Sequence, residues 1–314
     1  MTRYQIVADI GGTNARFACA TSGSNALEHI QTLQCATYPG VAEAIRAYLR
    51  GIPGSTVDTV CLAIAGPVEQ DTIRLTNNPW VFSRGELTKE LGCRVFVIND
   101  FTAQASALEV LEPGELDWLG YPRPHGGRVR VVTGPGTGLG VAGISPDGTI
   151  MPTEGGHIGF APTNEHELQL LQLLWKEFER VSVERLLSGP GLTTLHQANA
   201  MLEGKKVAAL SGAEVTAGAQ RSEPLCVQTV QDFLDILATV TGDYALAMGA
   251  LDGVYLTGGI LPKLGGLLDR ERFRRRFEAK GRMQPYCART PLALIKAEHT
   301  GLRGCLAALR RMAR

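Results

Sequence analysis

The first candidate for chemistry is a short glycine turn near the start of the chain. Residues 4–10 form an apolar, β-branched run typical of a strand, which stops at the letters GGTN at 11–14. Residues 15–20 alternate larger with smaller side chains and predict a second strand. A glycine turn between strands lets backbone N–H groups approach phosphate oxygens with no Cβ in the way, and the hydroxyl of Thr13 can add a donor.

Two further glycine turns follow strand-like runs. Residues 128–132 lead into GPGTGLG at 134–140 and then into apolar residues 141–144, so the strand, turn, strand unit occurs twice. A third turn, at 257–259, is followed by a loop or short helix. Dinucleotide-binding and P-loop folds pass from the glycine loop directly into a helix, an order that these units do not follow. The pattern predicts two related α/β lobes around one anion.

A carboxylate stands immediately before the first turn. Asp9 could orient a magnesium ion, through water, between the phosphates of a nucleotide. Alternatively, Asp9 could stabilise the turn by accepting backbone hydrogen bonds. The residue types leave both roles open.

A second carboxylate stands at the end of another strand. Residues 94–98 are an apolar run that ends at Asn99 and Asp100, and open α/β sheets bind ligands at the carboxyl ends of their strands. A carboxylate there can accept a proton from an attacking hydroxyl. The alternative is that Asp100 caps a helix that begins at Phe101, and the residue pattern alone slightly favours the cap.

Polar side chains gather in and after the segment TEGGHIGFAP at 153–162. Glu154 and His157 flank two glycines, and Glu184 follows Ser182 at the head of another helix. Carboxylates, an imidazole and an amide suit the hydroxyls of a sugar, because each hydroxyl needs a donor and an acceptor. Metal ligation is the weaker alternative, since one His joins two Glu. Glu184 could equally be a favourable charge in the first turn of its helix.

Length and charge bound the class of protein. A chain of 314 residues exceeds the size at which single cores stop growing, about 250 to 300 residues, so we expect two lobes. Lys plus Arg and Asp plus Glu both number 31, so no net charge draws the chain to nucleic acid or to an anionic membrane. The basic run at 270–276 contains Glu271 and predicts a solvated helix face.

The cysteines and the N-terminus indicate a compartment. The seven cysteines are odd in number, scattered and without a CxxC pair, so we expect free thiols in a reducing environment. Asp9 interrupts the first apolar run, which leaves no signal-peptide core, and no 18-residue apolar span is present. We therefore expect a cytoplasmic protein.

Helical spacing and loop composition suggest the lobe boundaries. Asn164 can cap a helix whose apolar stripe has four members, Leu168, Leu171, Trp175 and Phe178. Apolar residues at helical spacing over 302–312 predict a last helix that packs on the N-terminal lobe, and 114–127 is the most loop-like stretch. We expect a small lobe at 1–109, completed by a helix at 301–314, and a large lobe at 110–300.

Taken in order, these motifs resemble the bacterial glucokinase family, a branch of the actin and hexokinase superfamily. The resemblance runs along essentially the whole chain, through ADIGGTNAR, LAIAGPV, LTNNPW, VIND followed by FTA, GPGTGLGV, TEGGHIGFAP, SVERLLSGPG and VYLTGGI. A series of motifs in the family's order arises by chance far less readily than any one of them. The resemblance implies a two-lobed, actin/hexokinase-like (ribonuclease H-like) α/β fold with the active site in the interlobe cleft.

The resemblance also implies an activity, the ATP-dependent phosphorylation of the 6-hydroxyl of D-glucose to glucose 6-phosphate, which feeds glycolysis. Asp100 would be the general base, and the residues that hold glucose would be Asn99, Asp100, Glu154, His157 and Glu184, with Asn77 or Asn78 approaching the sugar. The implied ATP contacts are Ala8, Asp9, Ile10, Gly11, Gly12, Thr13, Gly136, Thr137, Gly138, Gly258 and Gly259. Mg²⁺ would arrive with ATP. No metal held by the protein is implied, because the cysteine-rich zinc motif of a neighbouring repressor and sugar-kinase group does not follow His157.

The expected partners are glucose and ATP, with no nucleic acid and no membrane, and a homodimer, common among relatives, stays open. A different class of protein is an actin-like ATPase or chaperone with the same nucleotide turns and a protein client, which the sugar cluster argues against. A non-catalytic sugar sensor would need an output module, for which 314 residues leave no obvious room.

Overall fold

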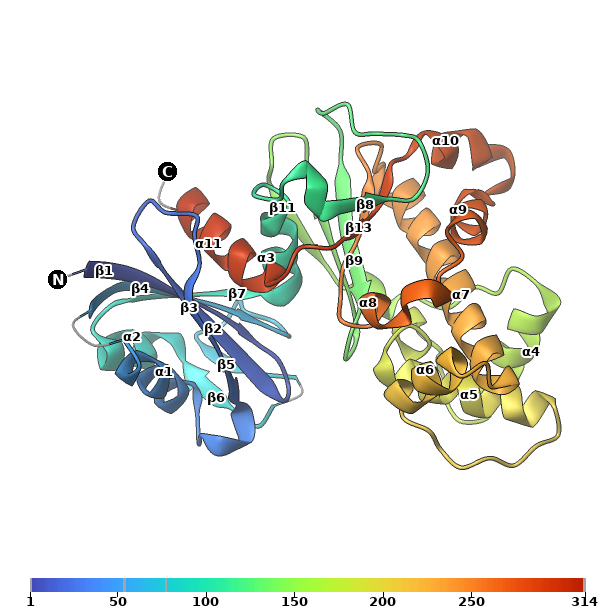
Figure 1. Cartoon of the computed structure of the whole chain (residues 1–314), viewed down its shortest axis with the longest axis horizontal. Coiled ribbons are helices and arrows are strands. Elements are labelled where there is room, and N and C mark those ends of the chain that lie inside the picture. The colour runs from blue at the N-terminus through green and yellow to red at the C-terminus, as the bar shows by residue number, and fades with distance from the viewer. Residues whose placement is uncertain (1, 53–54, 77, 313–314) are drawn as a thin grey trace. The chain divides into compact units, whose positions relative to one another are not determined.

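The computed structural model describes residues 2–52, 55–76 and 78–312 and divides the chain into two compact units (Figure 1). Unit 1 consists of Met1–Pro113 and Ala297–Arg314, and unit 2 of Gly114–Lys296. The boundaries expected from the sequence were 109/110 and 300/301. Asn77 and the last two residues of the expected C-terminal helix lie outside the described residues.

Unit 1 is built on a five-stranded sheet in the order β3-β2-β1-β4-β7. Its strands are β1 (Thr2–Ile10), β2 (Asn14–Thr21), β3 (Glu28–Gln34), β4 (Ser55–Ile64) and β7 (Arg94–Asn99), with a separate pair β5 (Thr72–Arg74) and β6 (Val81–Ser83). Strands β1, β2 and β3 pair antiparallel, whereas β1, β4 and β7 pair parallel. Its helices are α1 (Val41–Arg50), α2 (Arg84–Leu91), α3 (Asp100–Ala107) and α11 (Thr300–Met312), with a 3₁₀ turn η1 (Cys35–Thr37).

Strand β1 is buried on both faces, which explains its nearly continuous apolar sequence. Because side chains alternate along a strand, Ile6 and Ala8 pack in one core cluster with Ile45 of α1, and Val7 packs in another with Leu302 of α11. Figure 1 shows α1 and α2 on one side of this sheet, with α3 and α11 on the other. The helix that the spacing over 302–312 predicts is thus α11, in the core of unit 1.

Unit 2 repeats the strand pattern of unit 1 on a six-stranded sheet in the order β11-β10-β9-β12-β13-β8. The strands are β8 (Leu116–Trp118), β9 (Arg130–Pro135), β10 (Leu139–Ile144), β11 (Ile150–Thr153), β12 (Val254–Leu256) and β13 (Leu292–Ile295). Strands β9, β10 and β11 pair antiparallel, as β1, β2 and β3 do in unit 1. Strands β9, β12 and β13 pair parallel, as β1, β4 and β7 do. The two related α/β halves that the glycine turns predicted are therefore present.

Helices from distant parts of the chain build the remainder of unit 2. They are α4 (Glu165–Leu174), α5 (Gly189–Leu202), α6 (Gly212–Gln220), α7 (Pro224–Met248), α8 (Leu261–Leu264), α9 (Arg270–Glu278) and α10 (Gln284–Arg289), with the 3₁₀ turns η2 (Pro113–Glu115), η3 (Gly155–His157), η4 (Val183–Arg185), η5 (Gly265–Leu267) and η6 (Gly281–Met283). Asn164 caps α4, as predicted, by accepting the N–H of Glu167. The predicted apolar stripe is partly wrong: α4 ends at Leu174, and Trp175 is 55% exposed.

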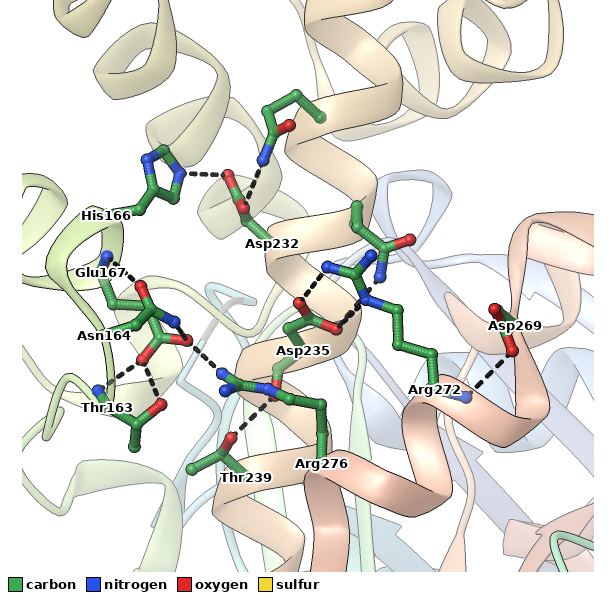
Figure 2. A network of polar contacts seen from close by, with 12 residues as sticks. Thr163, Asn164, His166, Glu167, Asp232, Asp235, Thr239, Asp269, Arg272 and Arg276 are labelled. Carbon is green, nitrogen blue, oxygen red and sulfur yellow. Dashed lines mark hydrogen bonds and ion pairs between the residues drawn. The ribbon is translucent and has the colours of Figure 1, made fainter. Parts of the chain in front are cut away.

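The basic run in α9 is solvated in part, as predicted, since Arg275 is 69% exposed, but two of its arginines also join a network of ion pairs (Figure 2). Arg276 forms an ion pair with Glu167, a carboxylate that is 4% exposed and also accepts the N–H and hydroxyl of Thr163. Arg272 donates to both oxygens of Asp235, at 3.0 and 2.7 Å. These ion pairs tie α9 to α4 and α7, and the charge of Arg276 offsets the desolvation of the buried Glu167 carboxylate.

The cysteines are free thiols, as predicted, and six of the seven are buried. Within the described ranges, every helix is too short or too polar to cross a membrane.

The contact between α3 and α11 yields a stability prediction. A Cβ built on Gly304 would lie 1.8 Å from the carbonyl oxygen of Ala103, so Gly304→Ala must push the two helices apart. We expect the free energy of unfolding of unit 1 to fall by at least about 2 kcal/mol, measured by urea titration.

The control is Gly85→Ala in α2, where a Cβ would meet its nearest atom, Oδ1 of Asp71, at an ordinary 3.4 Å. Replacing a helical glycine by alanine gains up to about 1 kcal/mol where space allows, so this variant should be as stable as the parent or slightly more. Equal stability of both variants would contradict the close packing of α11 on α3.

Candidate functional site

The first glycine turn joins β1 to β2 and is held by backbone and side-chain hydrogen bonds. The N–H of Gly11 donates to the carbonyl of Asn14 at 2.9 Å, and Nδ2 of Asn78 donates to the carbonyl of Gly11 at 3.3 Å. Oδ1 of Asn78 accepts the N–H of Trp80, so both ends of this buried amide serve the backbone. Gly11 and Thr13 are exposed to solvent, although the N–H and carbonyl of Gly11 are already hydrogen-bonded within the turn.

Asp9 lies at the end of β1, against the first turn of α11. A Cβ on Gly301 would come within 2.7 Å of Oδ2 of Asp9, so the glycine leaves room for the carboxylate. The side chain of Asp9 is 27% exposed, and Nη1 of Arg16 lies 3.9 Å from Oδ2. Burial raises the pKa of Asp9, while the positive charge of Arg16 opposes the rise. The carboxylate is thus held in a place that disfavours its charge.

Asn99 and Asp100 occupy the junction of β7 and α3, and the cap expected at Asp100 is wrong. Asn99 is the N-cap, with Oδ1 accepting the N–H groups of Phe101 and Thr102 at 2.9 and 3.2 Å. Asp100 is the first residue inside the helix, where Oδ1 accepts the N–H of Phe101 at 2.9 Å. The helix therefore has its cap without Asp100.

Parallel pairing brings the polar groups of unit 1 to one edge of the sheet. Ile10 pairs in register with Ile64, and Ile64 pairs in register with Asn99, so β1, β4 and β7 end together. Two strand spacings separate the glycine turn from Asn99, a distance of about 10 Å. This edge gathers Asp9, Gly11 to Thr13, Asn99 and Asp100, as ligand sites of parallel sheets require, whereas the side chains of Ala8 and Ile10 are buried in the core.

The sugar-type cluster predicted in unit 2 forms. Nε2 of His157 lies 3.9 Å from Oε2 of Glu154, and Nδ1 of His157 lies 4.0 Å from Oε1 of Glu184. The side chains of Glu154 and His157 are 79% and 58% exposed, so they face solvent and can meet a polar ligand. Among the described residues, no group of three His, Cys, Asp or Glu could hold a metal ion.

Two residues that the sequence analysis missed hold this cluster. The hydroxyl of Tyr244 donates to the carbonyl of Gly155 at 2.9 Å, and Nη1 of Arg180 donates to the carbonyl of His157 at 2.7 Å. Burial, with the nearby Asp243 and Glu184 carboxylates, raises the pKa of Tyr244, so its hydroxyl keeps the proton that it donates. No local signal could have identified either residue, because each acts on a carbonyl that is distant in sequence, 89 residues away for Tyr244 and 23 for Arg180.

The second and third glycine turns pack on one another. The N–H of Thr257 donates to the carbonyl of Thr133, and a Cβ on Gly134 would lie 2.1 Å from the carbonyl oxygen of Thr257. Gly258 has a φ of 96°, and a Cβ there would lie 2.4 Å from the carbonyl oxygen of Pro135. The turns bearing Gly136, Thr137, Gly138, Gly258 and Gly259 therefore form one glycine-lined surface of unit 2.

Solved structures identify the class of protein to which this fold and these residues belong. A glucokinase from an Antarctic psychrotroph is 35% identical, with a TM-score of 0.87, and the match covers 98% of this chain and 99% of that chain. A glucokinase from Balamuthia mandrillaris in complex with glucose is 21% identical, with a TM-score of 0.84 and coverage of 98% and 94%, which supports the fold alone. The fold is that of the actin/hexokinase-like sugar kinases.

Sequence comparisons narrow the class to one family. The family model described as Glucokinase matches residues 6–312. The glucokinase of Chromohalobacter salexigens is 47% identical over 313 residues, 98% of this chain and 98% of that protein. The chain belongs to the glucokinase family, whose members are ATP-dependent hexose kinases.

The raised pKa of Asp9 predicts a pH-dependent effect of Asp9→Asn. Because the folded state holds the Asp9 proton more tightly than the unfolded state, its contribution to stability is present at low pH. It is lost as the pH rises from the ordinary Asp range, near 4, through the raised value. We expect Asp9→Asn to be more stable than the parent at pH 7 and equal to it at low pH, measured by urea titration across pH.

Asp117 offers a control of opposite sign with the same 27% side-chain exposure. Its hydrogen bonds from Arg270 lower the pKa of Asp117, so its contribution is present at neutral pH and is lost as the pH falls through the lowered value. Asp117→Asn should therefore destabilise unit 2 at pH 7, and the difference should shrink in acid. If Asp9→Asn changed the free energy of unfolding by the same amount at every pH, the raised pKa of Asp9 would be contradicted.

Proposed function

We propose that this protein transfers the terminal phosphoryl group of ATP to the 6-hydroxyl of D-glucose and releases glucose 6-phosphate and ADP. The observation that carries the proposal is the cluster of Glu154, His157 and Glu184, in which two carboxylates supply hydrogen-bond acceptors and the imidazole ring supplies a donor. Membership of the glucokinase family supports the same substrate. The cluster favours this reaction over an ATPase with a protein client.

Asp100 is the proposed general base. The 6-hydroxyl oxygen attacks the γ-phosphorus, the bond from that phosphorus to the bridging oxygen of ADP breaks, and Asp100 takes the hydroxyl proton. Its placement at the carboxyl edge of a parallel sheet supports this role, as does the presence of a separate cap at Asn99. Because Asn99 caps α3, a change in the charge of Asp100 leaves that cap in place.

The backbone of the glycine turns is the proposed phosphate-binding surface. Gly11 and Thr13 are exposed in unit 1, and Gly136, Thr137 and Gly258 lie on the corresponding turns of unit 2. Phosphoryl transfer needs positioning and charge neutralisation more than covalent help from the protein. Mg²⁺ is part of the substrate here, and Asp9 offers the carboxylate oxygens that this cation prefers.

Three finer statements accompany the proposal. Activity requires Mg²⁺ bound to ATP, the protein forms a homodimer, and it works in the cytoplasm. Chelation followed by readdition of magnesium, light scattering of the purified protein and fractionation of cells test these three in turn.

The reaction itself is tested with pure protein, Mg-ATP and a panel of hexoses, with the products identified by mass spectrometry and NMR. Glucose 6-phosphate formed in proportion to ADP supports the proposal. ADP formed at the same rate without sugar, and no phosphorylated sugar, would favour the actin-like ATPase instead.

Asp100→Asn is predicted to retain glucose binding and lose turnover. Asparagine keeps the size of the side chain and cannot take the proton, so kcat should fall by about 10² to 10⁴, equivalent to about 2.7 to 5.5 kcal/mol of barrier. Steady-state kinetics and calorimetry with glucose measure the two effects separately.

Asn99→Ala is the matched control for the helix cap. It removes the side chain that caps α3 and should lower the free energy of unfolding by about 0.5 to 2 kcal/mol, whereas Asp100→Asn should leave it near the parent value. A soluble Asp100→Asn protein with parental melting temperature and kcat within about threefold of the parent would remove Asp100 from the chemistry.

A further inference from the structure

The carboxylate of Glu184 belongs to two surfaces at once. Its Oε1 faces His157 in the sugar-type cluster, at 4.0 Å from Nδ1. Its Oε2 accepts the backbone N–H of Leu139 at 2.8 Å, and Leu139 directly follows the second glycine turn. One side chain thus links the proposed glucose contacts to the turn expected to contact phosphate.

The glycine at 138 makes that link sterically feasible. A Cβ on Gly138 would lie 2.4 Å from Oε2 of Glu184, closer than real Cβ atoms approach other atoms, and 3.1 Å from Cδ, which is tight. Its neighbour Gly136 differs, because a Cβ there would meet no atom within 4 Å. The two glycines of one turn are therefore present for different physical reasons.

The backbone around Glu184 is held, so the side chain is the part that can move. The N–H of Val183 donates to the carbonyl of Ile158 at 3.0 Å, and the hydroxyl of Ser188 donates to the carbonyl of Glu184 at 2.9 Å. The N–H of Gly189 donates to the carbonyl of Gly136 at 2.9 Å, which ties the turn to the start of α5. A methyl group at 138 would consequently displace the carboxylate end of Glu184 and leave the fold in place.

We infer that the space at Gly138 and the N–H of Leu139 together hold the Glu184 carboxylate in the orientation that binds glucose. Gly138 is therefore a positioning residue for the sugar. This inference rests on the proposed function, in which Glu184 binds glucose. A hydrogen bond from an N–H to a carboxylate is among the stronger ones, and a preorganised group binds without first losing conformational freedom. Gly138 consequently acts on glucose affinity, in contrast to the ATP contact expected from its motif.

The test compares Gly138→Ala with Gly136→Ala, using calorimetry with glucose in the absence of nucleotide. Loss of a hydrogen bond to a charged group weakens binding by about tenfold to a hundredfold, so the Kd for glucose should rise by that factor in Gly138→Ala. Gly136→Ala should keep the parental glucose Kd, because its methyl group meets open space. Parental glucose affinity in Gly138→Ala, or a rise confined to its KM for ATP, would overturn the inference.

A double-mutant cycle tests the path through Glu184. In a Glu184→Ala background the colliding carboxylate is absent, so adding Gly138→Ala should lower kcat/KM for glucose no further. Additive losses would mean that Gly138 acts by another route and would overturn the inference.

The melting temperature separates failure of this inference from failure of the proposed function. If the parent protein binds no glucose, the proposed function fails by itself. The positioning of Glu184 by Gly138 is then still tested, because Gly138→Ala should lower the melting temperature in the parent and leave it unchanged in the Glu184→Ala background. Equal shifts of the melting temperature in both backgrounds would contradict the positioning of Glu184 by Gly138.

Discussion

Burial of both faces of the central strands is the constraint on which the positions of the functional groups depend. Strand β1 sends Ile6 into one core cluster and Val7 into another, so neither face is open to a polar ligand. Polar groups can then reach solvent only where strands end and the backbone leaves the ladder of hydrogen bonds. Parallel pairing of β1 with β4 and of β4 with β7 brings those ends to one edge, beside Asn99 and Asp100. Unit 2 repeats the arrangement at the ends of β9 and β12.

Glycine serves three different purposes in this fold, and the letter in the sequence does not distinguish them. Gly134 lets the second and third turns approach one another, and Gly304 lets α11 approach α3. Gly138 and Gly301 instead leave room for the carboxylates of Glu184 and Asp9. A Cβ on Gly136 would meet no atom within 4 Å, so this glycine leaves open space beside the turn. The first use concerns stability, whereas the other two concern the space beside groups that are proposed to act on a ligand.

Charge has a structural use in unit 2 that is separate from chemistry. Arg276 pairs with Glu167, 109 residues away in sequence, and Arg272 pairs with Asp235 of α7. A run of arginines on one helix looks like a solvated face when only its neighbours in sequence are visible, because its partners lie on other helices. The network in Figure 2 holds the start of α4, which follows the segment that bears Glu154 and His157. Ion pairs therefore help to position that segment.

The sequence by itself determined the strand and turn repeats, the family and the choice of Glu154, His157 and Glu184 as side chains that lie together, because these depend on local residue order and on motifs read along the chain. It could not place the cap at Asn99, since Asn99 and Asp100 are both good caps and only the backbone path decides which one precedes the helix. It also missed Tyr244 and Arg180, which act through carbonyls far away in the chain. The link from Glu184 to Leu139 was decided by tertiary structure alone, because a 2.8 Å hydrogen bond across 45 residues depends on how β10 and η4 pack.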